Sequence, residues 1–425
     1  MKYASVLLAV SCLLSVVSAQ WLETTIPLDS GSAPYALCYN TQNNKVYSAN
    51  MNEAKVTVID GATNQVLATL PAGSGPAALC YNSQNNRVYC ANRIGNTVTV
   101  IDGATDSVIR TVGTGRTPYA LCYNTQNNKV YCTNYSSNYV TVIDGATDSV
   151  VANVTSTFGP DALCYNLQND KVYCTNMNDS SVTVIDGATN QFITKVTAGH
   201  RPCALGYDSL DDKIFCANIG QSGNPDSTVT VIDGAADEVV ATVVVGYCPC
   251  ALCCSPHDGK VYVGHQPGNF VTVIDGATDS VLATVRVGTD PEALSYDPEY
   301  TRLFCVNNGS DSVTVVDGAT NGVLRSILVG NAPCALVWNP VRNRTYVANN
   351  SSSTISVLRD SLTGVEESPQ PQALSRKPAA TVIRSMPAGV VAFDAMGRRV
   401  VNPRSGIFFV RDSQAQAVRK VVQTE

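Results

Sequence analysis

Cysteine is the most prominent reactive residue type in this 425-residue chain, which contains 16 of them. Three pairs recur at matching positions of a repeat, on stretches predicted to be adjacent antiparallel strands, where a disulfide is conceivable. They are Cys80 with Cys90, Cys122 with Cys132, and Cys164 with Cys174. Other repeats hold different small residues at these positions, namely Ser48, Gly206, Val263 and Ser295. Removing Cys12 with the first 19 residues leaves an odd 15, and we predict that most of these thiols are free and buried.

Metal binding is the second chemistry that cysteines suggest. Four cysteines lie between residues 248 and 254, but no second pair follows at zinc-finger spacing. Cys203, Cys250 and Cys334 each follow the proline of a repeat and can approach the axis at one end of the fold. Packing explains both groups more simply, so we predict no metal and no cofactor.

Histidine is scarce, with only His200, His257 and His265. Copper propellers need many imidazoles, and propeller lyases need a histidine base among carboxylates. His200 precedes a repeat proline and can face a mouth of the fold, whereas His257 and His265 flank a hairpin and are expected to face solvent. No Gly-x-Ser-x-Gly elbow, phosphate-binding glycine loop or His-Glu-x-x-His is present. These absences weaken the case for an enzyme without excluding one.

The charge balance disfavours nucleic acid as a partner. The formal net charge is −6, the pI is near 5.2, and only 15% of the residues are charged. A phosphate backbone requires clustered lysine and arginine. We therefore expect a protein or glycan partner.

A repeat of about 42 residues organises the chain. Pro-x-Ala-Leu recurs in steps of 42 residues, except for one step of 47, at Pro34, Pro76, Pro118, Pro160, Pro202, Pro249, Pro291 and Pro333. Most repeats also carry Val-Tyr and a Val-Ile-Asp-Gly turn. Glycine tolerates positive φ and aspartate bonds its own backbone, so we interpret these aspartates as turn residues, not as catalytic groups or calcium ligands.

Each repeat reads as four short strands, which predicts one blade of a β-propeller. Eight sets of first, second and third strands are present, but nothing after residue 358 supplies an eighth outer strand. Residues 21–28 resemble the fourth strand of the other repeats. We expect them to pair beside residues 354–358 and to close the last blade. The prediction is an all-β, eight-bladed propeller, with seven blades as the alternative.

These repeat motifs, with Lys-Val-Tyr-Cys-Thr-Asn and Val-Thr-Val-Ile-Asp-Gly-Ala-Thr, resemble the YVTN β-propeller repeat family of bacterial surface-layer-like and periplasmic proteins. The resemblance covers residues 21–358. It implies a propeller in an extracytoplasmic setting and says little about chemistry. Relatives commonly have seven blades, which makes the count of eight a departure.

The two ends of the chain predict export. Residues 1–19 read as a signal peptide, with Lys2 before an apolar run and small residues before Gln20. No later segment is apolar enough to span a bilayer. The propeller is assigned to residues 20–360, a Pro- and Ser-rich linker to 361–379, and a small β domain to 380–425. Its Gly-Arg-Arg-Val and Gly-Ile-Phe-Phe-Val-Arg motifs are similar to sorting domains of type IX-like secretion systems, which implies the secretion machinery as a partner.

The residues that differ between otherwise alike repeats are the candidate site. Loops that enter the first strands surround one mouth of a propeller, and loops on a rigid frame concentrate binding residues. These entrances carry Tyr35, Arg116, Tyr119, Asp161, His200, Arg201, Tyr247, Asp290 and Glu292. An insertion within residues 219–228, with Asn224 and Asp226, accounts for the long step. We predict a secreted or cell-surface propeller that acts as a binding or structural scaffold; the alternative is a lactonase-like hydrolase or a lyase with its site at this mouth.

Overall fold

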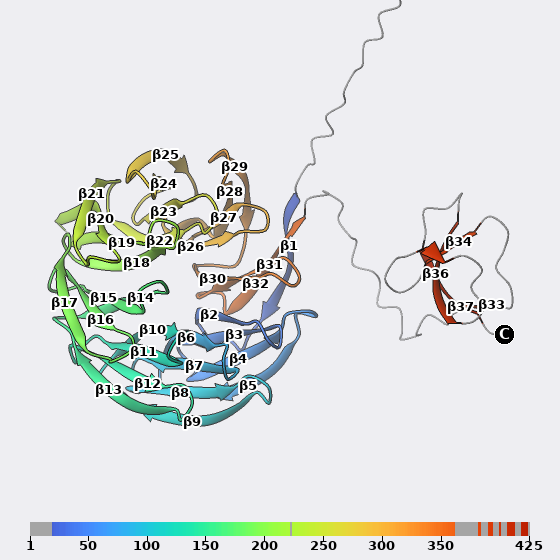
Figure 1. The fold of residues 1–425 in the computed structure, drawn as a ribbon, viewed down its shortest axis with the longest axis horizontal. Helices are drawn as coiled ribbons and strands as arrows, with labels where there is room; N and C mark the ends of the chain where they lie inside the picture. Colours follow the sequence, from blue (N-terminus) through green and yellow to red (C-terminus); the bar gives the residue numbers. More distant parts are fainter. Residues whose placement is uncertain are drawn as a thin grey trace, which may run out of the picture. The chain divides into compact units, whose positions relative to one another are not determined.

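The computed structural model describes residues 19–221 and 223–361, together with five strands between residues 381 and 423. The chain divides into two compact units, and the first ends at Gly364. In the first unit, eight four-stranded antiparallel sheets surround a central axis (Figure 1). The prediction of an all-β propeller with eight blades is confirmed, and the seven-bladed alternative is wrong. Residues 1–18 and 362–380 lie outside the described residues, and the predicted signal peptide and linker lie almost wholly within them.

Each of the first seven blades is built from four consecutive strands, the first nearest the axis (Figure 1). Blades 1 to 4 consist of β2 (Pro34–Asn40), β3 (Lys45–Asn50), β4 (Lys55–Asp60) and β5 (Val66–Pro71); β6 (Pro76–Asn82), β7 (Arg87–Asn92), β8 (Thr97–Asp102) and β9 (Ser107–Gly113); β10 (Pro118–Asn124), β11 (Lys129–Asn134), β12 (Tyr139–Asp144) and β13 (Ser149–Thr155); and β14 (Pro160–Asn166), β15 (Lys171–Asn176), β16 (Ser181–Asp186) and β17 (Phe192–Thr197).

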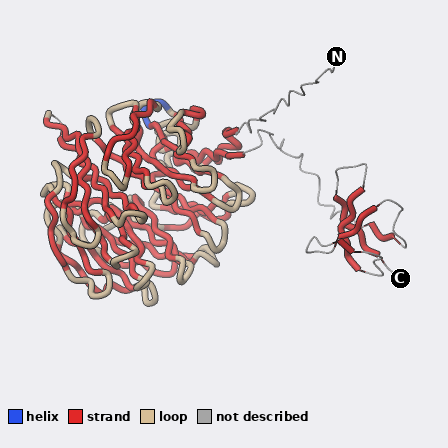
Figure 2. The backbone as a smooth tube through the Cα atoms, turned by 45° about the horizontal axis from the view of Figure 1, so that its top comes forward, coloured by secondary structure: helices blue, strands red, loops and turns tan. Residues whose placement is uncertain are grey.

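Blades 5 to 8 follow the same order, with one short 3-10 helix (blue in Figure 2). They consist of β18 (Pro202–Asp208), β19 (Lys213–Gln221), β20 (Asn224–Asp233) and β21 (Val239–Val244); β22 (Pro249–Cys254), β23 (Lys260–His265), β24 (Phe270–Asp275) and β25 (Ser280–Arg286); β26 (Pro291–Asp297), β27 (Arg302–Asn307), η1 (Asn308–Ser310), β28 (Ser312–Asp317) and β29 (Val323–Leu328); and β30 (Pro333–Asn339), β31 (Arg344–Asn349) and β32 (Thr354–Ser361).

The chain's own N-terminal strand closes the ring. β1 (Ala19–Pro27) pairs antiparallel with β32 and completes blade 8, with Trp21 opposite Arg359 and Ile26 opposite Ile355. This confirms the pairing predicted for residues 21–28. The last blade therefore contains both ends of the propeller segment. Without β1, the outer edge of β32 would be unpaired.

The hydrophobic core lies between blades. The second and third strands of each blade are buried on both faces, as Val56, Val58 and Ile59 illustrate. Val88 and Ile101 of blade 2 pack against Tyr47 and Val58 of blade 1, and equivalent clusters recur around the ring. The outer strands are exposed along much of their length. Strands sandwiched between two neighbouring sheets must be apolar on both faces, which is why the sequence shows continuous rather than alternating apolar runs.

Polar contacts clamp each blade to the next at the end opposite the repeat prolines. Lys45 Nζ in blade 1 donates to Asp106 Oδ2 in blade 2 over 2.7 Å, and the Tyr47 hydroxyl donates to Asp106 Oδ1 over 2.9 Å. Lys171 and Tyr173 contact Asp237 in the same way between blades 4 and 5. The recurring Lys-Val-Tyr motif thus joins neighbouring blades through both its charge and its hydroxyl group.

The Asp-Gly-Ala-Thr segments are turns, as predicted. Asp60 Oδ1 accepts the backbone N–H groups of Ala62 and Thr63 over 2.8 and 2.7 Å. The turn needs glycine because any larger residue would clash with the preceding blade. A Cβ on Gly103 would lie 2.5 Å from Asn40 Nδ2. The motif therefore combines a local turn with close contact between blades.

The strand register explains why the recurring cysteine pairs do not form bridges. Cys80 lies opposite Tyr89, and Cys90 lies opposite Leu79. The two cysteines are therefore one residue out of register, and adjacent positions on a strand point to opposite faces of a sheet. All 15 cysteines among the described residues are free thiols.

The second unit contains a five-stranded sheet in the order β33 (Thr381–Ile383), β37 (Val418–Gln423), β36 (Gly406–Asp412), β34 (Val390–Phe393) and β35 (Arg399–Val400). These five strands lie within residues 380–425, for which a small β domain was predicted. Within the described residues of both units, no helix has the length and apolar character needed to span a membrane.

Candidate functional site

Each of the eight blades places one residue near the axis where its innermost strand begins. We call these eight residues the axial ring and define it as the residue that follows each repeat proline: Tyr35, Ala77, Tyr119, Asp161, Cys203, Cys250, Glu292 and Cys334. The prolines themselves open the first strands, and successive first strands pack against one another around the axis (Figure 1). The scaffold is nearly the same in every blade, whereas the ring differs in charge, size and polarity.

Asp161 is the most perturbed acid of the axial ring. Its side chain belongs to a residue only 7% exposed. Burial raises the pKa of this carboxyl from 3.8 to about 7, and the guanidinium groups of Arg93 and Arg201 act in the opposite direction without cancelling the effect. A carboxyl held near its half-protonated state at neutral pH can donate or accept a hydrogen bond.

Tyr119 lies beside Asp161. The guanidinium of Arg93 is stacked over the Tyr119 ring, 5.2 Å from its centroid, and Tyr135 lies 6.5 Å from Tyr119 between centroids. Burial, followed by the neighbouring Tyr35, raises the pKa of Tyr119. Tyr35 and Tyr119 belong to blades 1 and 3, and they interact across blade 2 because Ala77 occupies the intervening ring position with a single methyl group.

The thiols of the three ring cysteines contact backbone carbonyl groups of the next blade. The Cys203 thiol lies 3.6 Å from the carbonyl oxygen of Pro249, and the Cys250 thiol lies 3.4 Å from that of Pro291. Cys334 lies 3.4 Å from the Pro34 carbonyl oxygen and so joins blade 8 to blade 1. Each thiol thus contacts the next blade. No set of three or more His, Cys, Asp or Glu side chains suited to a metal ion occurs in the part of the chain that the structure describes.

Glu292 is the second acid of the ring. Burial raises its pKa, a hydrogen bond with Asn308 lowers it, and the charge of Asp290 raises it. Glu292 acts electrostatically on the thiols of Cys250 and Cys334. It belongs to blade 7 and Asp161 to blade 4, so the two acids lie on different parts of the ring.

The structure brings together only some of the predicted site residues. Tyr35, Tyr119, Asp161 and Arg201 form one cluster, and Asp290 and Glu292 form another. The backbone N–H of His200 donates to Asp226 Oδ2 over 2.7 Å, which fixes the inserted hairpin of blade 5 beside the entrance. Arg116 is exposed, and Tyr247 is 52% exposed, so these two line the outer approach to the mouth.

Sequence reasoning missed Arg93, Tyr135 and Met177. All three follow the asparagine that ends a second strand, and Met177 Sδ lies 3.5 Å from Arg201 Nη2. The same argument from variable positions would have found them, because this position holds Met51, Arg93, Tyr135, Met177, Ile219, Gln266, Asn308 and Asn350 in successive blades. The hairpins between second and third strands reach the same mouth as the ring.

The expectation that His265 faces solvent is wrong. His265 is fully buried, and its Nε2 lies 3.0 Å from the Thr272 hydroxyl. In other blades an asparagine makes this contact, as Asn218 does with Thr230. Burial lowers the pKa of His265 to about 4, and a hydrogen bond with the Tyr247 carbonyl acts in the opposite direction. His265 is therefore a neutral structural residue.

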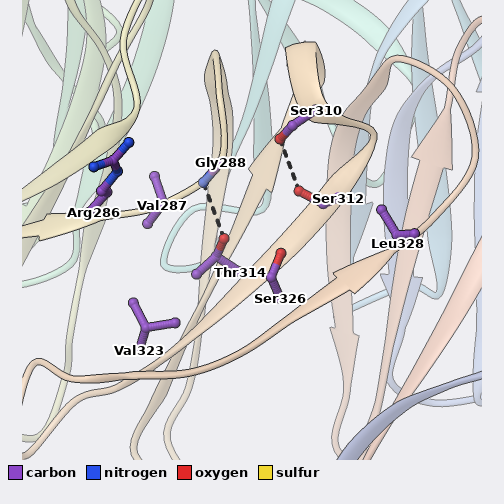
Figure 3. Close-up of a pocket in the computed structure, with 9 residues that line it drawn as sticks. All are labelled: Arg286, Val287, Gly288, Ser310, Ser312, Thr314, Val323, Ser326 and Leu328. Carbon is purple, nitrogen blue, oxygen red and sulfur yellow. Dashed lines mark hydrogen bonds between the residues drawn. The ribbon is translucent and has the colours of Figure 1, made fainter.

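A pocket of about 520 Å³ lies away from the axial ring, between the outer strand of blade 6 and blade 7 (Figure 3). It is lined by Arg286, Val287, Gly288, Ser310, Ser312, Thr314, Val323, Ser326 and Leu328. We call it the rim pocket. No prediction from the sequence pointed to it.

Comparison with known proteins supports the fold. The family described as "YNCE-like beta-propeller" matches residues 1–224, just over half of the 425 residues. No curated protein matches. The chain is similar to a solved structure of Kuenenia stuttgartiensis hydrazine synthase, with 17% identity, a TM-score of 0.56, and coverage of 79% of this chain and 98% of that one. It is also similar to Saccharomyces cerevisiae Sqt1, with 11% identity, a TM-score of 0.67, and coverage of 80% and 99%. At these identities the likeness concerns the fold alone.

Proposed function

Because this chain belongs to the YNCE-like β-propeller family, we propose that it is an exported binding propeller whose axial mouth recognises a polar group of a protein or glycan. The family fixes the scaffold, and the scaffold is nearly uniform around the ring. Recognition then depends on the positions that break this uniformity, which are the axial ring and the hairpin residues above it.

One observation carries this proposal: Asp161 is buried beside two arginines with a pKa near 7. Burial disfavours the charged form of this carboxyl even beside the two arginines, and so reduces the stability of the folded protein. Arg201 Nε is also buried without a hydrogen-bond partner among the described residues. Unpaired polar groups that cluster at a mouth gain their partners when a ligand binds, which makes this cluster the favoured binding point.

The proposed location is the cell surface or the extracellular medium. Support comes from the signal-like residues 1–19, from the YVTN-like repeat motifs, and from the sorting-like motifs of residues 380–425. In this arrangement the propeller is the binding unit, and the C-terminal unit is recognised by the secretion machinery.

The alternative is a propeller hydrolase or lyase at the same mouth. Such an enzyme needs an acid and a base that converge on one reacting atom. Asp161 and Glu292 come from blades 4 and 7, and His265 is used inside blade 6. The binding proposal needs only Asp161 and its arginine neighbours, so we prefer it.

The test is binding of the full chain to glycan and protein arrays, comparing wild type with Asp161→Asn. Asp208→Asn is the matched control, because Asp208 is also buried but ends its first strand, β18, whereas Asp161 lies near the start of β14. Other blades hold an asparagine at the Asp208 position. We expect D161N to weaken binding of array hits about tenfold and D208N to leave it unchanged. Equal loss in both variants, or none in either, would show that the mouth is not the binding site. Turnover of a lactone or glycan without stable binding would favour the enzyme.

A further inference from the structure

In the described part of the chain, the outer strand of every blade has one edge with no neighbouring strand. β5, β9, β13, β17, β21, β25, β29 and β1 are each the last strand of their sheet, and β21 lies on the outside of the ring (Figure 1). Such an edge can pair with a strand of another chain, and proteins usually block it with charged residues or proline. The residues of these strands therefore show which edges are protected.

Seven of the eight outer strands contain a residue that disfavours pairing. Five carry a charged residue, one ends in proline, and one contains asparagine, which is depleted in strands. These residues are Arg110 in β9, Lys195 in β17, Arg286 in β25, Arg325 in β29, Glu23 in β1, Pro71 in β5 and Asn153 in β13. In contrast, β21 (Val239–Val244) consists only of valine, alanine and threonine.

Alternate side chains of β21 form a row that faces solvent: Val240, Thr242 and Val244. All three residues are exposed, Val240 to 51% and Val244 to 72%, whereas the residues between them are more buried. The equivalent rows of other blades end in different residue types, such as Pro71 in β5 and Arg286 in β25. The row of β21 reads valine, threonine, valine in either direction.

This row is complementary to a second copy of itself. When two identical strands pair antiparallel about a twofold axis, one residue lies opposite its own copy, and the residues on either side of it exchange partners. Pairing about Thr242 places threonine opposite threonine and brings Val240 beside Val244 of the second copy. The hydroxyl groups can hydrogen-bond, and the valines bury apolar surface. The same pairing about Lys195 of β17 would place two like charges opposite each other, which is destabilising.

β29 is the other outer strand with a similar apolar row, which consists of Leu324, Ser326 and Leu328. The guanidinium of its central Arg325 donates to the Gln20 carbonyl oxygen over 2.7 Å, and the strand lies against β1. β29 therefore has contacts with blade 8 of its own propeller, and a second copy would have to approach a charged side chain. β21 imposes no such cost, because it carries no charged residue.

We propose that two copies of this chain associate edge to edge through β21, antiparallel and about a twofold axis at Thr242. The two four-stranded sheets of blade 5 then become one continuous sheet. Because each chain offers one such edge, the assembly closes as a dimer. No residue of the axial ring belongs to β21, so this inference does not depend on the proposed function.

The test is the association state of the full chain, measured by sedimentation velocity over a range of protein concentrations. We expect the wild type to show a monomer–dimer equilibrium. Thr242→Lys should weaken the dimer about tenfold or more, because each copy brings a like charge to the centre of the pairing. Blade 4 already accepts Lys195 at the equivalent position, so this variant should fold. A wild type that stays monomeric overturns the proposal.

Two further variants separate pairing through β21 from a general effect of charge. Val244→Arg introduces the residue that β25 holds as Arg286 and should also weaken the dimer. Thr69→Lys makes the change of Thr242→Lys at the equivalent position of β5 in blade 1 and should leave the dimer unchanged. Equal weakening by T69K and T242K, or a dimer that resists both T242K and V244R, overturns the assignment to β21.

An introduced cysteine tests the position of the twofold axis. Thr242→Cys should form a disulfide between two copies under mild oxidation, because directly opposite residues of antiparallel strands have the Cα separation of a disulfide. The wild type, whose 15 described cysteines are buried or half-buried, should form none, and neither should Thr69→Cys. A dimer of T242C without this disulfide overturns the pairing about Thr242. Assemblies larger than a dimer would show that several outer strands pair, and would overturn the assignment to β21.

Discussion

The Arg344 guanidinium donates its Nε–H to Glu23 Oε2 over 2.6 Å, joining two residues that are 321 positions apart. The same guanidinium donates through Nη1 to the carbonyl oxygens of Gly61 and Ala62, each over 2.9 Å. One side chain of blade 8 therefore binds both the closing strand β1 and the first complete blade. This contact is the place where an open array of blades becomes a ring.

Loss of the Glu23 carboxylate should therefore destabilise the whole propeller. For Glu23→Ala we expect a decrease of about 3 kcal/mol in the free energy of unfolding, because Arg344 remains buried without its partner. Urea unfolding measures this. Asp29→Ala removes one of the two acidic partners of the exposed Lys55 and should cost less than about 1 kcal/mol. Equal effects of the two substitutions would show that closure does not depend on this ion pair.

Two buried tyrosines at equivalent positions should respond differently to loss of the hydroxyl group. The Tyr89 hydroxyl donates to Asp148 Oδ1 over 2.6 Å, whereas the Tyr262 hydroxyl is buried with no partner among the described residues. Tyr89→Phe should lower the free energy of unfolding by about 1 to 3 kcal/mol, and Tyr262→Phe should leave it unchanged or raise it. Thermal unfolding of both variants decides this. A larger loss in Y262F would mean that its hydroxyl has an acceptor.

The thiols should be free but slow to react in the folded protein. Burial raises the pKa of Cys38 and of Cys122 from 9.0 to about 12, so the reactive thiolate is rare at pH 8. The reactivity of these two thiols should increase only as the pH approaches 12. Denaturation without reductant should expose most of the 15 cysteines that follow residue 18. Reaction of fewer than half of them would establish a disulfide framework instead.

The stability contribution of Asp161 should depend on pH between its unfolded and folded pKa values. Its folded pKa of about 7 exceeds the ordinary value of 3.8, so the folded state binds the proton more tightly. The resulting stabilisation is fully present below pH 3.8 and is lost as the pH rises through about 7. Relative to Asp161→Asn, the wild type should lose up to about 4 kcal/mol over this range. A pH-independent difference between the two proteins would place the carboxyl in water.

The propeller should fold without the C-terminal unit, and the C-terminal unit should be needed only for delivery to the cell surface. Deleting residues 365–425 should leave the melting temperature of the propeller unchanged, because β1 and not the C-terminal unit closes blade 8. The truncated protein should be exported across the inner membrane but should not reach the cell surface, which cell fractionation measures. A loss of several degrees on truncation would instead assign residues 365–425 a structural role in the propeller.

The sequence by itself determined the number of blades and their closure. Pro-x-Ala-Leu at a fixed period, turns such as Asp60 to Thr63, and a missing outer strand after β32 are local signals, because strand and turn preferences act over a few residues. Because the repeat occurs eight times, the same local signals appear eight times along the chain. Variation at the residue after each proline likewise pointed to Tyr119 and Asp161.

Only the tertiary structure decided which of these residues act together. A shift of one residue in register separates Cys80 from Cys90, and His265 is buried at a position where other blades bury an asparagine. Arg93 reaches Tyr119 from the neighbouring blade, 26 positions earlier in the chain. Each of these outcomes depends on side-chain direction and on the volume left by a neighbouring blade, and neither quantity is set by the order of residues along one strand.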